Sequence, residues 1–405
     1  MINKTIIFLT TILLFASCSV NKKITKLFKE GYTQEQSFKA KIPFEYRLGL
    51  IIIKVELNNE TYDFVLDSGA CCTMLSKELA EKFGKKGLIT KNVGGHQQGV
   101  SQIMDFTKVE VLTIGGIKFR EIASGIGDFN QSIEVGCTEI DGIIGTNLMG
   151  LAVWAIDFRN QIITITNTKE SLSLEGKMTK IPFYTNELAM PYCQVKINGI
   201  EEKNILIDLG SPNGFNLSYS NYEKIQKELP KNKKSTGYGY LASGFFGFGK
   251  KDSIYHLQAS SLSIGAVKLN NQIVKFSKSL NPTIGTAFFK NYDLVMNWKD
   301  KELLLHPHTK YDNQQFIHGG FGLNYQDDAL RVSTLIKESD AERSGMQLGD
   351  KIIQIDGKDY STASISDYCD LLKQVSKDSY SIKNIVINRN GDQLSFDIKN
   401  EVIIE

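Results

Sequence analysis

The sequence lacks the features that would place it in a specialised class. Its 405 residues include 34 glycines but only seven prolines, with no low-complexity tract, which is typical of a chain of strands and turns. The formal net charge is only +2, and no basic stripe is interleaved with aromatic residues, so a nucleic-acid partner is not indicated. Hydrophobic residues make up 41% of the chain, enough to build a core without disulfide staples.

Metal and redox motifs are also missing. None of the six cysteines has the spacing of metal ligands, and the adjacent pair Cys71-Cys72 is not a C-x-x-C redox motif. His306 and His308 have no third ligand nearby, so we interpret this stretch as an ordinary loop. We therefore expect no metal and no cofactor. In an oxidising compartment one or two disulfides are compatible with the sequence, which does not assign their pairing.

The chain also has no apolar run long enough to cross a bilayer. Ile6 to Phe15 spans ten residues, which fits the hydrophobic core of a signal peptide. Ala16-Ser17-Cys18 follows and resembles the bacterial lipobox. The resemblance implies residues 1–17 as a signal peptide, lipidation of Cys18, a solvated basic tether over 18–44, and a place in the cell envelope on a periplasm-facing membrane. The alternative is a plain secretory signal with an incidental cysteine.

What the chain does contain is a repeat. Ile51 to Leu57 alternates, turns at Asn58-Asn59 and runs into Asp67-Ser68-Gly69. Cys193 to Ile197 alternates, turns at Asn198-Gly199 and runs into Asp208-Leu209-Gly210. Each pattern predicts a hairpin whose second strand delivers an aspartate to a glycine turn.

Later landmarks repeat in the same order. Ile143-Ile144-Gly145 follows the first aspartate, and Thr283-Ile284-Gly285 follows the second at nearly the same distance. The repeat predicts a first lobe over residues 45–180 and a second lobe over 181–310. A purely structural duplication would leave the same pattern, so the aspartates need an argument of their own.

The combination of strand, aspartate, glycine and downstream Ile-Gly element resembles the retropepsin-like aspartic peptidases. The resemblance covers roughly residues 45–308. It implies a mostly β fold with two tandem β-barrel lobes forming a pepsin-like pseudo-dimer within one monomer. It also implies a catalytic dyad of Asp67 and Asp208 acting on a water molecule. Two close carboxyl groups share a proton, so one can accept a proton from water while the other donates to the amide carbonyl.

The resemblance also implies which residues support the dyad. Gly69 and Gly210 allow a tight backbone turn beneath each carboxyl group, and Gly145 and Gly285 pack under those turns. Ser68 provides the hydroxyl that the family uses for hydrogen bonds between the lobes. Leu209 departs from this pattern, because its side chain has no such hydroxyl. Either the support is rebuilt locally, with Ser211 as the candidate, or Asp208 is a relic on a lobe kept for binding.

Family members close the cleft with glycine-rich flaps. The candidates are Gly94 and Gly95 in the first lobe, and Tyr238 and Tyr240 in a glycine-rich stretch of the second. A flap excludes water and holds the substrate backbone. An ordinary flexible loop is the alternative interpretation of the same composition.

Residues 317–400 resemble a PDZ domain. The resemblance rests on Gly320-Phe321-Gly322-Leu323, the stretch from Ser339 to Asp350, and Ile352 to Gly357. It implies a groove that takes a peptide as an added strand, with the backbone amides of Phe321, Gly322 and Leu323 binding a carboxylate. This domain would capture chain ends for the cleft, or serve only as a rigid adaptor.

Two functions therefore compete. The first is a cell-envelope aspartic endopeptidase that hydrolyses peptide or protein substrates and uses the PDZ domain to bind termini. The second is a catalytically weak or inactive peptide-binding lipoprotein, which Leu209 favours. In either case we expect a membrane partner through the N-terminal lipid.

Overall fold

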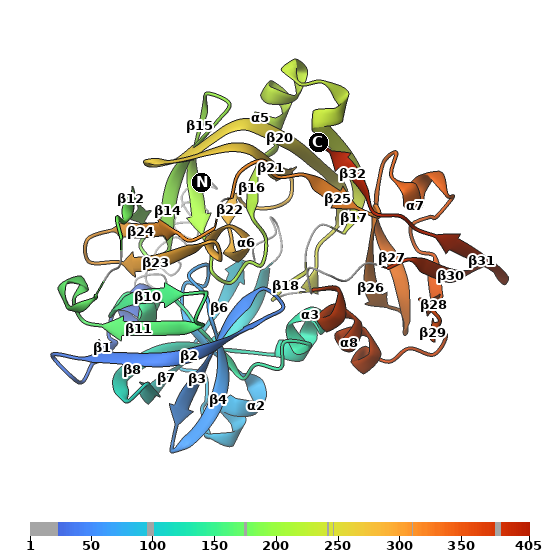
Figure 1. Cartoon of the computed structure of the whole chain (residues 1–405). Helices are drawn as coiled ribbons and strands as arrows, with labels where there is room; N and C mark the ends of the chain where they lie inside the picture. The colour runs from blue at the N-terminus through green and yellow to red at the C-terminus, as the bar shows by residue number, and fades with distance from the viewer. Residues whose placement is uncertain are drawn as a thin grey trace, which may run out of the picture.

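The computed structural model describes residues 23–94, 101–173, 176–240, 243–245, 247–309, 311–376 and 382–405. The fold is mostly β, with short helices at the edges (Figure 1). Two sheets of 14 strands each account for most of the strands in these ranges. None of the helices there is long and apolar enough to cross a membrane.

The first lobe opens with the predicted hairpin. Strand β3 (Leu50–Leu57) pairs with β4 (Glu60–Leu66) through a turn in which Asn58 and Asn59 both have positive φ, a conformation that asparagine tolerates. The hairpin prediction is confirmed. The rest of this lobe consists of β1 (Tyr32–Thr33), β2 (Lys39–Arg47), β5 (Thr73–Ser76), α2 (Lys77–Lys82), β6 (Ile89–Gly94), β7 (Ser101–Ile114), β8 (Ile117–Gly127), η1 (Phe129–Gln131), α3 (Ile133–Gly136), β9 (Gly142–Ile144), α4 (Thr146–Met149), β10 (Val153–Asp157), β11 (Ile162–Thr166) and η2 (Lys169–Ser171).

The second lobe repeats the pattern. Strand β14 (Pro191–Ile197) pairs with β15 (Ile200–Ile207) through a turn at Asn198 and Gly199 with positive φ at both. The other elements are β12 (Thr179–Pro182), β13 (Tyr184–Thr185), β16 (Phe215–Ser218), α5 (Tyr219–Ile225), η3 (Gln226–Glu228), η4 (Lys231–Lys233), β17 (Lys234–Tyr240), β18 (Ser243–Gly244), β19 (Gly247–Phe248), β20 (Lys251–Ile264), β21 (Val267–Ser277), β22 (Thr283–Ile284), α6 (Thr286–Phe289), β23 (Tyr292–Asn297) and β24 (Glu302–Pro307). His306 therefore lies at a strand end, not in the loop we expected.

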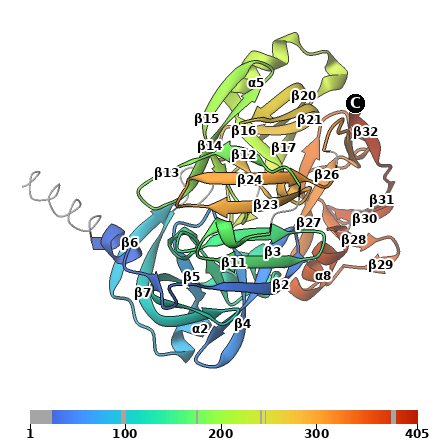
Figure 2. The ribbon, with the colours of Figure 1, turned by 60° about the vertical axis from the view of Figure 1, so that its left-hand side comes forward.

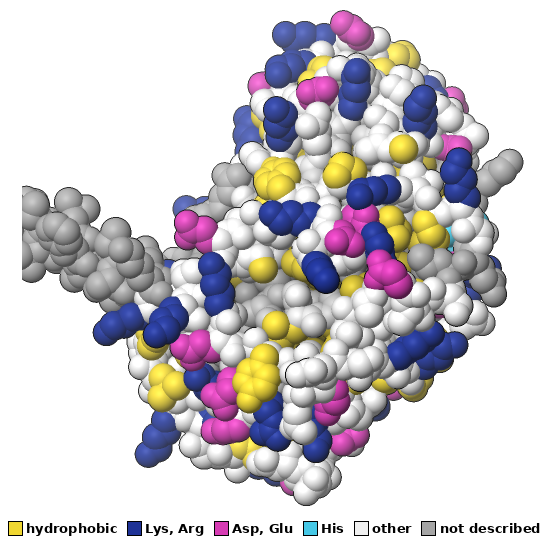
Figure 3. Space-filling view, turned by 90° about the vertical axis from the view of Figure 1, so that its left-hand side faces the viewer, with side chains coloured by type: hydrophobic (Ala, Val, Ile, Leu, Met, Phe, Trp, Pro, Cys, Tyr) yellow, Lys and Arg dark blue, Asp and Glu magenta, His cyan; other side chains and the backbone are white. Residues whose placement is uncertain are grey.

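The lobes are joined by a sheet to which both contribute. Its strand order is β12-β24-β23-β10-β11-β2, with β10 of the first lobe paired to β23 of the second. One hydrophobic core runs through both lobes and contains Trp154 and Met296, which face each other in that pairing and are fully buried. Figure 2 shows this joining sheet between the lobes. Basic and acidic side chains are interspersed over the face seen in Figure 3.

The C-terminal domain, which we expect to be a PDZ domain, shares a sheet with the second lobe. Strand β17 pairs with β20 on one edge and with β27 (Ala329–Ile336) on the other, so the second 14-stranded sheet runs from the lobe into the domain. A separate core fills the domain. Its elements are β25 (Phe316–His318), β26 (Phe321–Gln326), α7 (Asp340–Arg343), β28 (Lys351–Ile355), β29 (Lys358–Asp359), α8 (Ile365–Val375), β30 (Asn384–Arg389), β31 (Asp392–Asp397) and β32 (Glu401–Ile404).

The predicted solvated tether is folded from residue 23 onward, so that expectation is wrong for its described part. Residues 23–28 are helical, and Ile24, Leu27 and Phe28 are buried against Phe106 and its neighbours. Apolar residues three and four positions apart form one face of a helix, a signal that the many lysines of this segment obscured. Cys18 and the expected signal peptide, residues 1–17, lie outside the described residues.

Candidate active site

The two aspartates occupy equivalent places in the two lobes. Asp67 directly follows β4, which pairs in parallel with β9, and Asp208 directly follows β15, which pairs in parallel with β22. The Asp67 backbone N–H donates to Ile144 O at 3.0 Å, and the Asp208 N–H donates to Ile284 O at 2.9 Å. Each aspartate is thus fixed by the apolar residue just before the glycine of its own lobe.

The structure brings the two aspartates together. Their carboxyl groups are hydrogen-bonded to each other. A methyl group on Gly210 would lie 2.2 Å from Asp67 Cγ, and one on Gly69 would lie 2.4 Å from Asp208 Oδ1. Each glycine therefore packs against the carboxyl group of the opposite lobe, and any larger residue at either position would displace it.

Backbone amides support both carboxyl groups. Asp67 Oδ1 accepts from the N–H groups of Gly69 at 2.7 Å and Ala70 at 3.1 Å. Asp208 Oδ1 accepts from Gly210 N–H at 3.0 Å. These N–H groups carry no proton that titrates, so they hold the carboxyl groups in place in either protonation state.

Burial raises the pKa of both aspartates. At Asp67 the hydrogen bonds from Gly69 and from Asp208 oppose this increase. At Asp208 burial is again the largest cause, the negative charge of Asp67 adds to it, and the pKa lies well above its usual range. Asp208 is 8% exposed, whereas Asp67 is partly exposed. The pair therefore favours a state in which the two carboxyl groups share one proton.

The hydrogen bonds between the lobes beneath the dyad are asymmetric. Ser68 Oγ donates to Ile207 O at 2.7 Å and accepts from Leu209 N–H at 3.0 Å, so one hydroxyl group links the two aspartate loops in both directions. The Leu209 side chain, fully buried, packs in the core shared by the lobes. The second lobe thus contributes backbone groups and apolar contact where the first contributes a hydroxyl group.

The hydroxyl group of Ser211 does not replace the one that Leu209 lacks, because its hydrogen bonds among the described residues go to Asn213 of the same loop. Its Oγ accepts within its own loop, from the N–H of Asn213 at 3.5 Å. The Ser211 backbone N–H instead donates to the backbone carbonyl of Asp208 at 3.3 Å, and this N–H lowers the pKa of Asp208. Ser211 therefore supports the second aspartate from within its own loop, rather than by a bond between the lobes.

Gly145 and Gly285 lie under the aspartate loops, where the resemblance puts them. A methyl group on Gly145 would be 2.3 Å from the backbone of Cys72, and one on Gly285 would be 2.3 Å from Asn213 O. The next residue in each lobe then reaches across. Thr146 Oγ1 donates to Leu188 O at 2.9 Å, and Thr286 Oγ1 donates to Gly49 O at 2.6 Å. Sequence reasoning missed this second pair of links between the lobes.

The flap candidates have different surroundings. Gly94 ends β6, and Gly95 lies outside the described residues. Tyr238 and Tyr240 lie within β17, and Tyr238 pairs with Leu335 of the PDZ domain. Beyond β17, Phe245 packs edge-on against Phe129 of the first lobe, with ring centroids 5.1 Å apart. The second-lobe stretch therefore spans from the PDZ sheet to the opposite lobe.

The predicted peptide-binding residues of the PDZ domain begin β26. Phe321 is buried, whereas Gly322 and Leu323 are partly exposed. Gly320, just before them, has a φ of +94°, and a methyl group there would overlap Ser339. The strand pairs with β27 along one edge, and α8 contacts the same strand, because Tyr325 and Tyr368 stack with ring centroids 6.2 Å apart.

One disulfide joins distant parts of the chain. Cys137 of the first lobe is bonded to Cys369 of α8, while Cys71, Cys72 and Cys193 are free thiols. The sequence separation of 232 residues leaves no local signal from which the pairing follows. Only the number of cysteines pointed to a disulfide.

Comparison with known proteins agrees with the geometry. Residues 53–148 match the family model for aspartyl protease, and residues 331–383 match the one for PDZ domain. The chain is also 25% identical over 134 residues to the DNA damage-inducible protein 1 of Kluyveromyces lactis. The aligned region covers 33% of this chain and 30% of that relative. The chain thus combines a retropepsin-like aspartyl protease domain with a C-terminal PDZ domain. The matched protease range includes Asp67 and Gly145 but ends before Asp208.

Proposed function

We propose that this protein is an aspartic endopeptidase whose dyad is Asp67 and Asp208. The observation that carries the proposal is the contact of two carboxyl groups, each held by backbone amides and each packed against the glycine of the other lobe. A structural duplication alone gives no reason to place two acidic groups in contact at a buried junction, where their mutual repulsion is unfavourable.

The arrangement suits hydrolysis of a peptide bond. Asp67 in its ionised form takes a proton from the attacking water as the new C–O bond forms. Asp208 in its protonated form donates to the carbonyl oxygen, which gains negative charge. When the C–N bond breaks, Asp67 gives its proton to the leaving amine, and Asp208 takes back a hydroxyl proton from the tetrahedral intermediate as the new carboxyl group forms. The aspartates thus exchange roles without a covalent intermediate.

A second candidate is a peptide-binding protein with little or no activity. It is favoured by Leu209, because the hydroxyl group on that side of the dyad is replaced by an apolar side chain. The two hydrogen bonds of Ser68 to the Leu209 loop favour the peptidase, since they connect the loops from one side.

The decisive test is cleavage of a mixed peptide library by a fragment beginning at Ser19, followed by mass spectrometry from acid to neutral pH. Cleavage should be lost in both Asp67→Asn and Asp208→Asn. Asp392→Asn makes the same chemical change at an exposed position at the start of β31 and should retain full activity. If the folded wild-type fragment cleaves nothing, the peptide-binding function replaces the peptidase.

We further propose that the PDZ domain binds peptide or protein ends and that the protein is anchored in the cell envelope through lipidated Cys18. The support for the anchor is the N-terminal sequence alone, with its short apolar stretch followed by Ala16-Ser17-Cys18. Incorporation of radiolabelled fatty acid that persists in Cys18→Ala would refute the anchor.

A further inference from the structure

The groove of the PDZ domain meets the first lobe. A PDZ domain binds peptides by adding a strand to a free sheet edge. In the described residues β26 pairs with β27 along one edge only, and α8 packs beside the strand. The Tyr368 hydroxyl of α8 reaches Leu323 O of β26 at 3.5 Å, which marks the groove between these two elements.

The same tyrosine contacts a first-lobe segment, residues 132–139, which contains α3. Its hydroxyl donates to Glu134 Oε1 at 2.9 Å. Cys137 is bonded to Cys369, the residue that follows Tyr368 in α8. Figure 1 shows α3 beside α8. The segment therefore meets the domain where the strand and the helix come together.

Burial shows that this contact belongs to the packed interior. Cys137 is 2% exposed and is part of the hydrophobic core of the PDZ domain rather than that of its own lobe. Ile133 packs against the same core, together with Leu323 and Leu372. Ile133 thus adds an apolar side chain to the core that Leu323 of the groove also contacts, as a bound peptide would.

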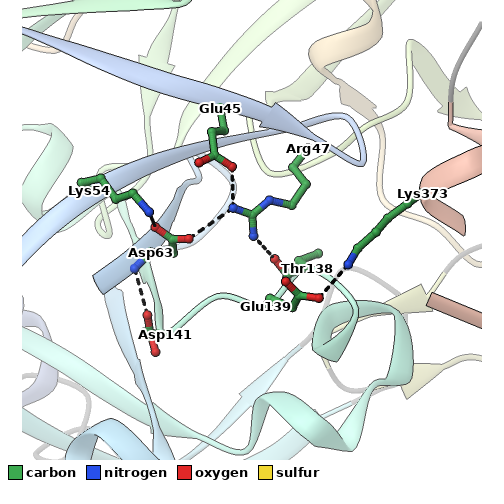
Figure 4. Close-up of polar contacts among 8 residues, drawn as sticks. All are labelled: Glu45, Arg47, Lys54, Asp63, Thr138, Glu139, Asp141 and Lys373. Atoms are coloured by element: carbon green, nitrogen blue, oxygen red, sulfur yellow. Dashed lines mark hydrogen bonds and ion pairs between the residues drawn. The ribbon is translucent and has the colours of Figure 1, made fainter. Parts of the chain in front are cut away.

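Polar contacts hold the far end of the segment (Figure 4). Lys373 of α8 pairs with Glu139 at 2.6 Å. From the first lobe, Arg47 Nη1 donates to Thr138 O at 2.7 Å. The segment is thus held by its own lobe on one side and by the PDZ helix on the other.

We propose that residues 132–139 are the resident ligand of the PDZ groove, and that the Cys137–Cys369 disulfide decides whether the groove accepts another chain end. The proposal rests on the peptide-binding role proposed above. Reduction by a dithiol breaks the S–S bond and transfers two electrons and two protons. Cys137 and Cys369 become thiols, and the dithiol closes to its own disulfide. Residues 132–139 then compete with external peptides only through their noncovalent contacts with the domain.

The size of the effect follows from linkage. An external peptide binds only the fraction of molecules in which the groove is open, so its apparent affinity falls by that fraction. A covalently tethered segment keeps that fraction low, and releasing it should tighten peptide binding about tenfold or more.

The test measures binding of a fluorescein-labelled octapeptide with an apolar C-terminal residue and a free carboxylate to the full chain from Ser19. Oxidised wild type should bind weakly, and the Cys137→Ser/Cys369→Ser variant should bind about tenfold tighter or more. Dithiothreitol should strengthen binding in wild type but not in the double variant. Cys193→Ser removes a free buried thiol and should behave as wild type. Equal binding by oxidised wild type and the double variant would overturn the proposal.

Hydrogen exchange separates this proposal from the peptide-binding role. Loss of the disulfide should speed exchange in residues 132–139 and in α8. Unchanged exchange there would overturn the internal docking. Faster exchange with no peptide bound by any form would leave the docking in place and refute peptide binding by the PDZ domain.

Discussion

Leu209 is the residue at which this site departs most from its family resemblance. The hydroxyl that would bridge the lobes is absent from its side chain, yet its backbone N–H is bonded to Ser68 Oγ at 3.0 Å. One serine therefore serves both loops, and the leucine fills apolar space in the shared core. The departure was visible in the sequence. Its compensation by Ser68 was not, because that depends on how the two loops meet.

Substitutions at Ser68 and Leu209 should separate the contribution of the bridging hydroxyl group from that of the buried apolar side chain. Ser68→Ala leaves the Leu209 N–H and the Ile207 carbonyl without this partner, and should lower the free energy of unfolding by about 1–3 kcal/mol. Leu209→Thr restores the family's hydroxyl but removes buried apolar volume, and should also destabilise the protein, by about 1–3 kcal/mol. Urea denaturation measures both changes. A stabilised Leu209→Thr variant would show that the hydroxyl group outweighs the lost packing.

The dyad should make stability depend on pH. The folded-state pKa of each aspartate is raised, so the contribution is fully present below the unfolded-state pKa, near 4. It is lost as the pH rises through the folded-state value, at about 1.4 kcal/mol for each unit by which the pKa is raised. Asp208→Asn should therefore be more stable than wild type at neutral pH and lose that advantage in acid. Denaturation at both pH values measures the difference, and an Asn variant less stable than wild type at neutral pH would contradict it.

At the scale of the element, the duplicated hairpins and glycines position the site. The alternating strands and Asn-containing turns predicted β3–β4 and β14–β15 correctly, because period-2 patterns and positive-φ residues are local signals. The pairing of β17 with β27 was not predictable in this way. The glycine-rich stretch around Tyr238 and Tyr240 suggested a flap, but a methyl group at Gly237 or Gly239 would lie within 2.6 Å of a carbonyl oxygen of β27. These glycines allow the PDZ backbone to approach.

The glycines under the aspartate loops should be intolerant of substitution. In Gly145→Ala and Gly285→Ala the new methyl group would lie 2.3 Å from backbone atoms, which cannot move without shifting the loops. We expect a loss of about 1–3 kcal/mol in the free energy of unfolding for each. Gly94→Ala provides the matched control for stability, since no heavy atom lies within 4 Å of its methyl position. Thermal or urea unfolding measures all three, and a control as destabilised as the others would undo the packing explanation.

At the scale of the whole molecule, the PDZ domain is attached to both lobes. It continues the sheet of the second lobe through β17 and β27 and is bonded to the first through Cys137. From the sequence we predicted the domain but expected it to be a separate unit, because a linker-like polar stretch precedes it. Deleting residues 317–405 would therefore unpair β17 and Cys137 as well as remove a groove. Such a deletion does not isolate substrate delivery.

The disulfide should contribute substantially to stability. Cross-linking residues that are 232 positions apart restricts the unfolded chain, and its loss should cost about 2–5 kcal/mol. The measurement compares guanidinium denaturation of oxidised wild type with that of Cys137→Ser/Cys369→Ser, with Cys193→Ser as the control for cysteine removal. Equal midpoints for wild type and the double variant would show that the cross-link adds nothing to stability and would contradict this prediction.

The same bond closes a covalent ring that contains the entire second lobe, since the chain enters it after Cys137 and leaves it before Cys369. A single break in the backbone anywhere between residues 138 and 368 opens the ring without producing two molecules. The nicked protein would migrate as two bands only after reduction. A protein built in this way tolerates a cut in its own surface loops and keeps both aspartates on one covalently joined molecule.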